Sequence, residues 1–390
     1  MKKILFILPE FKFGGTVYST LNMVSLLDKD MYDVYVLPMT HQGPMKEEYE
    51  NMGIKLLPEN LLLASIYGNV KEEKRPFARL FYYGIKAFRR VYMHFGKDFE
   101  MIVVRIASQK YSKMRFDVVA SCQEGAPTKM ASVIKAKKNI AWFRCEATKY
   151  FPNLPTTSHN EYYKPFDKIV CVSQCTCDDF KLCLPQFADK TIAIHNAQNL
   201  EDIYSKANEI VDDPRFDTTR FTLISLGRMN PSKRMAEIPN VAKKLKNAGC
   251  SFDWYILGDG NVGGEQERCV NNIESLEVSD CVHYLGGKVN PYPYIKKSDL
   301  LVSLSLVEAC PRVVNEALIL KKPCICTDFA SAHEFVFDGK NGYVDKLDKI
   351  PSILKNVMQN DSEYQKLKYY CDGITFDNQP ILKSLNEIFS

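Results

Sequence analysis

The sequence of 390 residues contains no apolar run long enough to span a bilayer, no short internal repeat and no low-complexity tract. A membrane-spanning helix needs about 20 consecutive apolar residues, and repeat proteins show a regular period. These absences exclude a spanning helix, a repeat architecture and a fibrous chain. The net charge of +4 is also too small to indicate a nucleic-acid partner, so local clusters of charge matter more than the total.

A regular cysteine framework is absent as well. The 13 cysteines are odd in number and irregularly spaced, in a chain far longer than a disulfide-stapled secreted domain, which favours free thiols in a reducing cytosol. Residues 4–8 after Lys2 and Lys3 resemble a signal peptide, but this apolar run is short, ends at Pro9 and lacks a small-residue cleavage site. We therefore interpret it as a buried first strand of a cytoplasmic protein.

Strands and helices alternate along both halves of the chain, which predicts two doubly wound α/β domains. The expected strands cover residues 2–8, 34–37, 54–57, 116–120, 139–142, 168–172, 191–194, 221–226, 254–257, 283–285, 300–304 and 323–327. We expect domains at residues 1–198 and 221–377. A polar, acid-rich segment, 199–220, is expected to link them, and a closing helix spans 378–390.

The first informative motif is a basic turn directly after the predicted strand 221–226. Gly227 allows the backbone to turn tightly, and Arg228 and Lys233 follow it. In open α/β sheets ligands bind at the carboxyl ends of the strands, where an Arg fork and a Lys charge suit phosphate oxygens. A solvated basic turn is the alternative interpretation.

The second motif is a pair of glutamates eight residues apart. Pro311 predicts that a helix begins between them, so that Glu308 lies in the loop after strand 300–304 and Glu316 in the early helix. A helix N-terminus attracts a diphosphate, and a neighbouring carboxylate can accept hydrogen bonds from sugar hydroxyls. Otherwise these residues are one exposed and one helical glutamate.

Together the two motifs resemble those of the retaining glycosyltransferase family 4, which has the GT-B fold. Its members carry Gly-Arg-x-x-x-x-Lys and Glu-x7-Glu in the C-terminal domain. The resemblance spans the chain and is densest over residues 221–345. Further matching segments are Gly14-Gly15, Val172-Ser173, His195-Asn196, Gly258-Asp259-Gly260, Glu334, Asp338-Gly339 and Asn341-Gly342.

This resemblance implies two Rossmann-like domains facing a central cleft, with a role for each matching residue. Arg228 and Lys233 would hold the donor diphosphate, Glu316 the ribose hydroxyls and Glu308 the transferred sugar. The other implied donor-binding residues are Gly15, Gly227, Gly258, Cys310, Pro311, Arg312 and Val313, with main-chain N–H groups offered by residues 310–313. Two cations and a helix end can offset the growing charge of the leaving diphosphate, so no metal and no cofactor are expected.

Three positions depart from the family pattern. Ala309 stands where members often have Gly, and Arg144 and Glu146 stand where relatives commonly have His and Asp. Arg144 and Glu146 are placed on the acceptor side, and no acceptor-side base is assigned. Retaining transfer in this family is thought to use the donor's own phosphate as proton acceptor, so the missing His need not abolish catalysis.

The expected activity is transfer of a sugar from a UDP- or GDP-linked donor to a lipid-linked or saccharide acceptor. The resemblance implies a context of bacterial surface polysaccharide or capsule synthesis. One alternative is a nucleotide-sugar epimerase of the same fold, for which no acid/base set is identified. A second is a non-catalytic partner of another glycosyltransferase, which the intact Arg228, Lys233, Glu308 and Glu316 argue against.

Residues 76–97 predict a helix with aromatic and basic faces. The apolar face carries Phe77, Phe81, Ile85, Phe88, Tyr92 and Phe95. The opposite face carries Arg75, Arg79, Lys86, Arg90 and Lys97. This pattern favours an interfacial helix that holds the protein peripherally on the inner face of the cell membrane. Alternatively, the apolar face packs on the first domain.

Three other patterns are interpreted as structural. The Gly-x-Gly-x-x-Gly run at 258–263 is a weak dinucleotide signal, because it follows the second strand of its domain. Asp28-Lys29-Asp30 is a turn away from the ligand edge rather than a metal-binding Asp-x-Asp. The cysteines are interpreted as small core residues rather than zinc ligands: Cys171, Cys175, Cys177 and Cys183.

Overall fold

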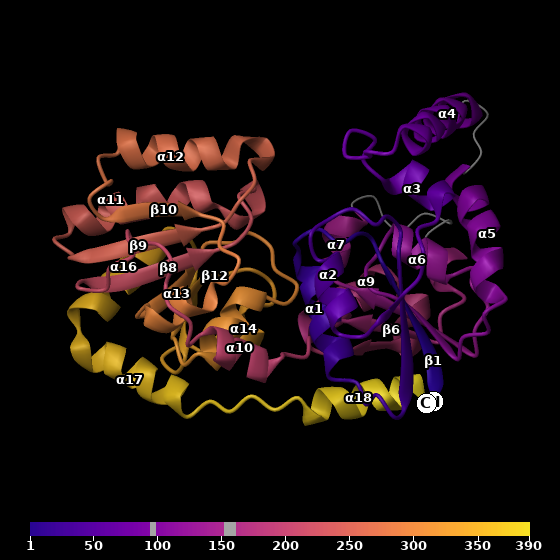
Figure 1. Cartoon of the computed structure of the whole chain (residues 1–390). Helices are drawn as coiled ribbons and strands as arrows, with labels where there is room; N and C mark the ends of the chain where they lie inside the picture. Colours follow the sequence, from indigo (N-terminus) through magenta and orange to yellow (C-terminus); the bar gives the residue numbers. More distant parts are fainter. Residues whose placement is uncertain (94–98, 152–160) are drawn as a thin grey trace. The chain divides into compact units, whose positions relative to one another are not determined.

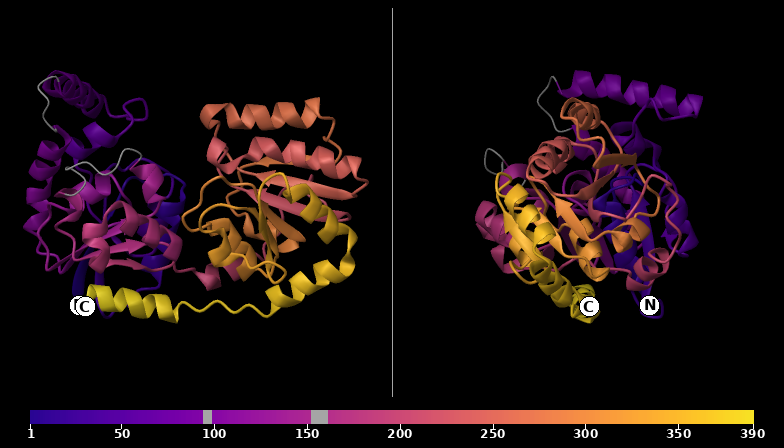
Figure 2. Two further views of the ribbon diagram at one scale, coloured as in Figure 1. Left: turned by 180° about the vertical axis from the view of Figure 1, so that it is seen from behind. Right: turned by 90° about the vertical axis from the view of Figure 1, so that its left-hand side faces the viewer.

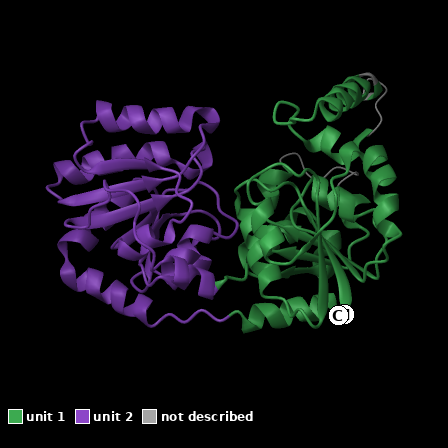
Figure 3. Ribbon diagram, viewed as in Figure 1, with its two compact units in different colours: residues 1–199, 378–390 green, residues 200–377 purple. Residues whose placement is uncertain are grey.

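The computed structural model describes residues 1–93, 99–151 and 161–390 and divides the chain into two compact units (Figures 1 and 3). The first unit comprises Met1–Asn199 and Asn378–Ser390, and the second comprises Leu200–Asp377. Each unit is a parallel β-sheet with α-helices packed on it. The prediction of two doubly wound α/β domains is therefore confirmed. Phe95 and Lys97 lie outside the described residues.

The sheet of the first unit has seven parallel strands in the order β3-β2-β1-β4-β5-β6-β7. They are β1 (Lys2–Leu8), β2 (Tyr32–Pro38), β3 (Lys55–Leu56), β4 (Val118–Ser121), β5 (Lys138–Phe143), β6 (Lys168–Cys171) and β7 (Thr191–Ala193). The helices are α1 (Gly15–Ser25), α2 (Lys46–Asn51), α3 (Leu61–Tyr67), α4 (Pro76–Met93), α5 (Phe99–Ser112), α6 (Ala126–Ala131), α7 (Ala147–Tyr150), α9 (Gln174–Cys183) and α18 (Gln379–Phe389), with a 3-10 turn η1 (Pro185–Lys190). The side chains of residues 4–8 are completely buried, which confirms the predicted buried first strand.

The sheet of the second unit has six parallel strands in the order β10-β9-β8-β11-β12-β13. They are β8 (Phe221–Leu226), β9 (Phe252–Leu257), β10 (Val282–Gly286), β11 (Leu300–Ser303), β12 (Cys324–Thr327) and β13 (Gly342–Asp345). The α-helices are α10 (Leu200–Lys206), α11 (Ile238–Asn247), α12 (Glu265–Ser275), α13 (Tyr292–Lys297), α14 (Arg312–Ile319), α15 (Ala332–Phe335), α16 (Ile350–Gln359) and α17 (Asp361–Asp372). Three 3-10 turns complete the unit: η2 (Pro231–Lys233), η3 (Met235–Glu237) and η4 (Val262–Gly264). Strand β13 was not predicted from the sequence.

Both sheets reverse their strand order beside the first strand of the unit. In the first unit the reversal lies between β1 and β4, and in the second it lies between β8 and β11. Adjacent strands whose connections leave in opposite directions leave a crevice at their carboxyl ends, where α/β proteins bind ligands. The loops after β1, β4, β8 and β11 are therefore the positions at which a site is expected.

The predicted linker, residues 199–220, belongs almost entirely to the second unit. Helix α10 begins at Leu200 and buries Ile203 in an apolar core of that unit. Asp213, one of the acids of this segment, is paired with two cations, Arg215 at 2.6 Å and Lys288 at 2.9 Å. The sequence shows clustered acids, which is typical of a linker, but it does not show that Lys288, far outside the segment, pairs with Asp213.

The C-terminal helix α18 returns to the first unit. The ring of Phe389 lies 6.0 Å from that of Phe6 in β1, and the hydroxyl of Tyr32 donates a hydrogen bond to Asn386 Oδ1 at 2.8 Å. The predicted closing helix therefore packs on the first sheet.

Helix α4 lies beyond α3, on the side away from the sheet (Figures 1 and 2). The apolar face expected from the sequence is divided in the structure. Ala78 and Tyr82 are buried in a cluster with α3, and Ile85 and Tyr92 are half-buried against the main core. Among the described side chains of α4, the large apolar ones that are exposed are Phe77, Leu80, Phe81, Tyr83 and Phe88.

The predicted basic face of α4 is also reduced. Arg75 forms ion pairs with Glu59 and Glu73, and Lys86 donates a hydrogen bond to the carbonyl of Gly68 at 3.1 Å. Arg79 and Arg90 remain exposed. Helix α4 therefore packs on the first unit with one part of its surface and exposes aromatic side chains on another. No helix in the described part of the chain is both long enough and apolar enough to cross a membrane.

Candidate active site

The loop after β8 is a tight turn that presents two cations. Gly227 has a φ of 156°, and a Cβ there would lie 3.0 Å from the Met235 side chain, so glycine is required. Asn230 caps the turn, because its Oδ1 accepts the Ser232 hydroxyl at 2.6 Å and the Lys233 N–H at 3.2 Å. Arg228 is exposed and has no side-chain partner among the described residues.

Gly258, at the end of the neighbouring strand β9, supports this turn. A Cβ on Gly258 would lie 1.8 Å from the carbonyl oxygen of Gly227, so the two loops can pack only if this residue is glycine. The hydroxyl of Tyr284 donates to the Gly258 carbonyl at 2.8 Å and holds the contact from the other side. This packing explains the first glycine of the Gly-x-Gly-x-x-Gly run by the shape of the loop.

Glu308 lies in the loop after β11, as predicted, and it contacts the turn after β8. Its Oε1 forms an ion pair with Lys233 Nζ and accepts the Ser305 hydroxyl at 2.9 Å. The main chain joins the same loops, because the Leu306 N–H donates to the Ser232 carbonyl at 2.7 Å. The two predicted motifs, distant in sequence, are therefore brought together at the reversal between β8 and β11.

Helix α14 begins at Arg312 with Pro311 as its N-cap, which confirms the helix start predicted between the two glutamates. The first turn of a helix has unpaired main-chain N–H groups and the positive end of the helix dipole. Pro311 has no N–H, so within residues 310–313 only Cys310, Arg312 and Val313 can donate.

Glu316 is buried on α14, with 2% of its surface exposed. Its Oε1 accepts the Tyr292 hydroxyl at 3.2 Å and lies 3.2 Å from Arg312 Nε. Its Oε2 is also buried and has no hydrogen-bond partner among the described residues. Burial raises the pKa of Glu316, and the nearby Arg312 opposes this change only in part. An unpaired buried carboxylate oxygen is costly, so this position suits a ligand that donates a hydrogen bond.

The glycine loop of the first unit follows β1, at the reversal of the first sheet. Gly14 is the N-cap of α1, and a Cβ on Gly15 would have no atom within 4 Å. The Thr16 hydroxyl donates to Gln123 Oε1 at 2.9 Å and so ties this loop to the one after β4. The packing of the first unit does not require glycine at residue 15, and the space beside it is open.

Arg144 and Glu146, assigned to the acceptor side, follow strand β5. Arg144 is held by three acceptors: the Cys122 carbonyl at 2.6 Å, Asn196 Oδ1 at 2.7 Å and Ser19 Oγ at 2.8 Å. Glu146 pairs with Lys149 at 2.7 Å, and its buried Oε1 has no partner among the described residues. Arg144 therefore braces the carboxyl edge of the first sheet.

The remaining sequence patterns have structural explanations. None of the 13 cysteines, all within the described residues, forms a disulfide, and Cys171 and Cys177 are buried in the core. Asp28 forms a turn by accepting the Asp30 N–H at 2.8 Å. Within the described ranges, no group of three or more His, Cys, Asp or Glu side chains is arranged to hold a metal ion.

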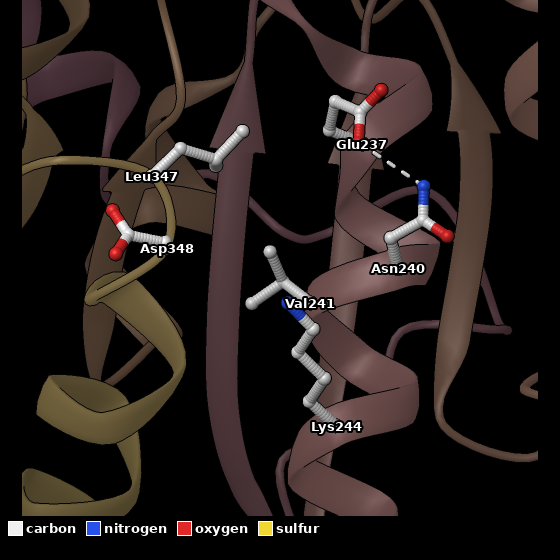
Figure 4. A pocket seen from close by; sticks show the side chains of 6 residues that line it. All are labelled: Glu237, Asn240, Val241, Lys244, Leu347 and Asp348. Atoms are coloured by element: carbon white, nitrogen blue, oxygen red, sulfur yellow. Dashed lines mark hydrogen bonds between the residues drawn. The ribbon is translucent and has the colours of Figure 1, made fainter.

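A cavity of about 340 Å³ lies elsewhere in the second unit (Figure 4). Asn240, Val241 and Lys244 of α11 line one side of it, and Leu347 and Asp348 line the other. None of the predicted site residues lines this cavity.

Sequence reasoning missed the side chains that hold the site residues. Asn230 fixes the turn that carries Lys233, Ser305 holds Glu308, and Tyr292 holds Glu316. The Asn230-Pro231 dipeptide is typical of such a turn and offered a local signal. No local signal marks Ser305 or Tyr292, because each acts on a residue that only the fold brings near.

Known proteins resemble this chain in sequence and in structure. Residues 206–370 match the family model of the glycosyl transferases group 1. An uncharacterized glycosyltransferase of Methanocaldococcus jannaschii is 24% identical over 227 residues, which are 56% of this chain and 55% of that protein. The N-acetylgalactosamine-N,N'-diacetylbacillosaminyl-diphospho-undecaprenol 4-alpha-N-acetylgalactosaminyltransferase of Campylobacter jejuni is 28% identical over 173 residues, which are 43% of this chain and 44% of that protein.

The crystal structure of HepE from Anabaena in complex with UDP superposes with a TM-score of 0.71 at 16% identity, covering 99% of both chains. The fold is GT-B. The chain spans about half the length of the curated relatives it matches. The sequence similarities support a glycosyltransferase, and the family-model match lies in the second unit, where Arg228, Lys233, Glu308 and Glu316 lie.

Proposed function

We propose that the protein is a retaining glycosyltransferase of the family 4 type that takes a sugar from a nucleoside diphosphate sugar. The observation that carries this proposal is the convergence of Arg228, Lys233, Glu308 and the start of α14 at the carboxyl ends of β8 and β11. Cations beside a helix N-terminus are suited to a diphosphate, and the buried Glu316 with an unpaired oxygen is suited to a hydroxyl donor.

In this proposal each residue acts on a different part of the donor. Arg228 and Lys233 stabilise the β-phosphate as it gains charge, without a metal ion or a cofactor. Glu316 accepts hydrogen bonds from the ribose hydroxyls, and Glu308 accepts them from the transferred sugar. The acceptor hydroxyl bonds to the anomeric carbon as the bond to the β-phosphate oxygen breaks, and that phosphate takes the proton.

The proposed donor is linked to UDP or GDP. UDP is the first to test, because HepE, which shares the fold, was solved in complex with UDP. Gly15 leaves open space at the start of α1, which would allow the glycine loop to approach a phosphate.

The proposed acceptor is lipid-linked or a saccharide, in surface polysaccharide or capsule synthesis. The name of the Campylobacter jejuni relative describes action on a diphospho-undecaprenol glycolipid. Exposed Phe77, Leu80 and Phe81 on α4, with Arg79 and Arg90, have the composition of an interfacial helix. We therefore place the protein on the cytoplasmic, inner face of the membrane, as a peripheral protein.

This proposal can be tested with a panel of nucleotide sugars. Each is assayed first for thermal stabilisation of the protein and then for sugar transfer. We expect one UDP- or GDP-sugar to raise the melting temperature, because a ligand that binds only the folded state stabilises it. NMR of the product should show the anomeric configuration of the donor. An inverted product would contradict the retaining assignment.

The same panel separates the two alternatives. Conversion of the donor to its epimer, without any acceptor, would identify an epimerase. Failure of every nucleotide to bind would favour a non-catalytic partner subunit.

A further inference from the structure

In the structure, Lys233 and Glu308 are paired with each other. Their side chains are only 21% and 13% exposed. Partial burial strengthens the attraction between two charges relative to a pair on the surface. The contact is notable because the proposed function gives these residues separate targets, the diphosphate and the sugar.

Glu308 is the fixed member of the pair. Its carboxylate accepts the Ser305 hydroxyl at 2.9 Å, and its main-chain carbonyl accepts the Ser331 hydroxyl at 2.7 Å. Ser305 is buried, and its own carbonyl accepts the Thr327 hydroxyl at 2.5 Å. This chain of hydrogen bonds runs into β12, so it can hold Glu308 whether or not Lys233 is present.

Lys233 is the member that can move. It lies at the end of η2, and no other side-chain partner of its ammonium group is found among the described residues. A lysine side chain has four rotatable bonds and a charge that is not tied to one direction, so it can change partners at little cost.

We propose that the Lys233–Glu308 pair is a lock on the donor site that a nucleotide sugar opens. This inference rests on the proposed function. When the donor enters, Lys233 leaves Glu308 for the diphosphate, and Ser305 keeps the freed carboxylate in place to accept a hydroxyl of the sugar. The ion pair is therefore replaced by two new contacts, that of Lys233 with the phosphate and that of Glu308 with the sugar.

The lock discriminates between donor and product. A nucleotide sugar supplies both replacement contacts, whereas a free nucleoside diphosphate supplies only the phosphate. Free diphosphate would leave Glu308 without a partner for its charge and close to another anion, which is unfavourable in a partly buried site. The pair thus weakens binding of the leaving diphosphate and helps its release after transfer.

Titration calorimetry of Glu308→Gln with UDP tests the lock, with GDP measured in parallel. Glutamine keeps the shape and still accepts the Ser305 hydrogen bond, but it releases Lys233 and removes the opposing charge. We expect Glu308→Gln to bind the free diphosphate about fivefold or more tightly than wild type, although its transfer activity falls. Lys233→Ala should bind the diphosphate more weakly than wild type.

Glu277→Gln is the matched control, since it makes the same substitution in the same unit. Glu277 pairs with Lys243 at 3.6 Å, and its side chain is 86% exposed, so its loss should leave diphosphate affinity unchanged. If Glu308→Gln strongly lowers the melting temperature of the protein, the variant Glu308→Asp is measured in its place. Aspartate keeps the charge but draws it back from Lys233, so diphosphate affinity should rise by less than in the glutamine variant.

The outcomes separate the lock from the proposed function. The lock is contradicted if Glu308→Gln binds the diphosphate no more tightly than wild type. If Lys233→Ala still binds it more weakly, the proposed donor site is nevertheless supported. Absence of nucleotide binding by the wild-type protein removes the proposed function and the lock with it.

Discussion

In the proposed function, Glu316 and Lys233 would serve the donor in two different ways. Glu316 is buried, held by Tyr292, and has one carboxylate oxygen left unpaired among the described residues. Lys233 is partly exposed and is paired with Glu308. In the proposed function Glu316 would be preorganised for a ligand, whereas Lys233 would exchange one partner for another. We therefore expect their substitutions to differ in kind.

Glu316→Gln and Lys233→Ala should each lower kcat/KM for the donor by at least tenfold, since hydrogen bonds to charged groups contribute about 1.5–3 kcal/mol. Ribose contacts are similar in the ground and transition states, so Glu316→Gln should act mainly through donor KM. Charge on the β-phosphate grows as the sugar leaves, so Lys233→Ala should also lower kcat. Steady-state kinetics with the correct donor measures both. Wild-type kcat/KM in both variants would show that the donor binds elsewhere.

The raised pKa of Glu316 predicts a pH dependence of donor binding. Burial favours the neutral acid, so the carboxylate becomes protonated at a higher pH than an ordinary glutamate, whose pKa is about 4.3. The ionised form is the better acceptor for ribose hydroxyls. As the pH falls through this raised pKa, donor KM should therefore rise, and the rise should begin above the usual glutamate range.

Measurement of donor KM against pH in wild type and Glu316→Gln checks this assignment. Glutamine cannot titrate, so the variant should have a higher KM that stays flat over the interval in which the wild type changes. An identical pH profile in both proteins would assign the titration to another group.

At the scale of the element, α4 combines a packed stripe with an exposed aromatic surface. Ala78 and Tyr82 fasten it to α3, whereas Phe77 and Leu80 are 89% and 72% exposed. Large apolar side chains that remain in water are typical of a surface that contacts a membrane or another protein. The fastening means that the helix can present this surface without unfolding.

Replacement of Phe77 and Leu80 with Ser should weaken binding to vesicles that contain anionic lipid, because both side chains would leave the lipid interface. Arg79→Glu with Arg90→Glu should do the same, by at least tenfold, since each basic residue near such a surface contributes about 1 kcal/mol. Lys86 is left unchanged because it donates to the Gly68 carbonyl. Co-sedimentation with the vesicles provides the measurement.

Tyr369→Ser is the matched control for this experiment. Tyr369 lies on α17 of the second unit and is 77% exposed, so its replacement removes an exposed aromatic ring far along the chain from α4. Nucleotide binding should be unchanged in all of these variants. If the α4 variants bind vesicles as tightly as wild type does, the role of α4 is to pack on α3 and not to bind a membrane.

At the scale of the whole molecule, the sequence similarity is uneven. The family model covers residues 206–370, which lie within the second unit, whereas Arg144 and Glu146, predicted on the acceptor side, lie in the first. We interpret this difference chemically. In the proposed function the second unit binds the nucleoside diphosphate through cations and a helix end, whereas acceptors vary, and with them the loops that bind them.

Transfer activity should survive EDTA, because Arg228, Lys233 and the start of α14 can together offset the charge of the leaving diphosphate. We expect a rate within about twofold of the untreated enzyme. Loss of activity that Mg²⁺ or Mn²⁺ restores would instead assign a metal ion to the diphosphate, and the roles proposed for the two cations would be wrong.

Several features of the fold could be predicted because they depend on local patterns. Apolar runs such as residues 4–8 predict buried parallel strands, and Pro311 predicts the start of α14 because proline suits the beginning of a helix. Strand β13 was missed because Gly342–Asp345 is short, begins with glycine and lacks a continuous apolar run. The structure assigns most of the predicted linker, 199–220, to the second unit, through contacts that are distant in sequence, such as that of Asp213 with Lys288, 75 residues further along the chain.

The sequence by itself determined the two alternating series of strands and helices, the motif residues and the loops that carry them, because each depends on residues that are close in the chain. Only the tertiary structure decided which side chains meet. Lys233 and Glu308 are 75 residues apart, and they pair because β8 and β11 are neighbours in the sheet. Tertiary packing likewise decides that Glu316 is buried, that the α4 face is divided into buried and exposed parts, and that Ser305 supports Glu308. Strand order and helix packing depend on interactions across the whole unit, which no local pattern contains.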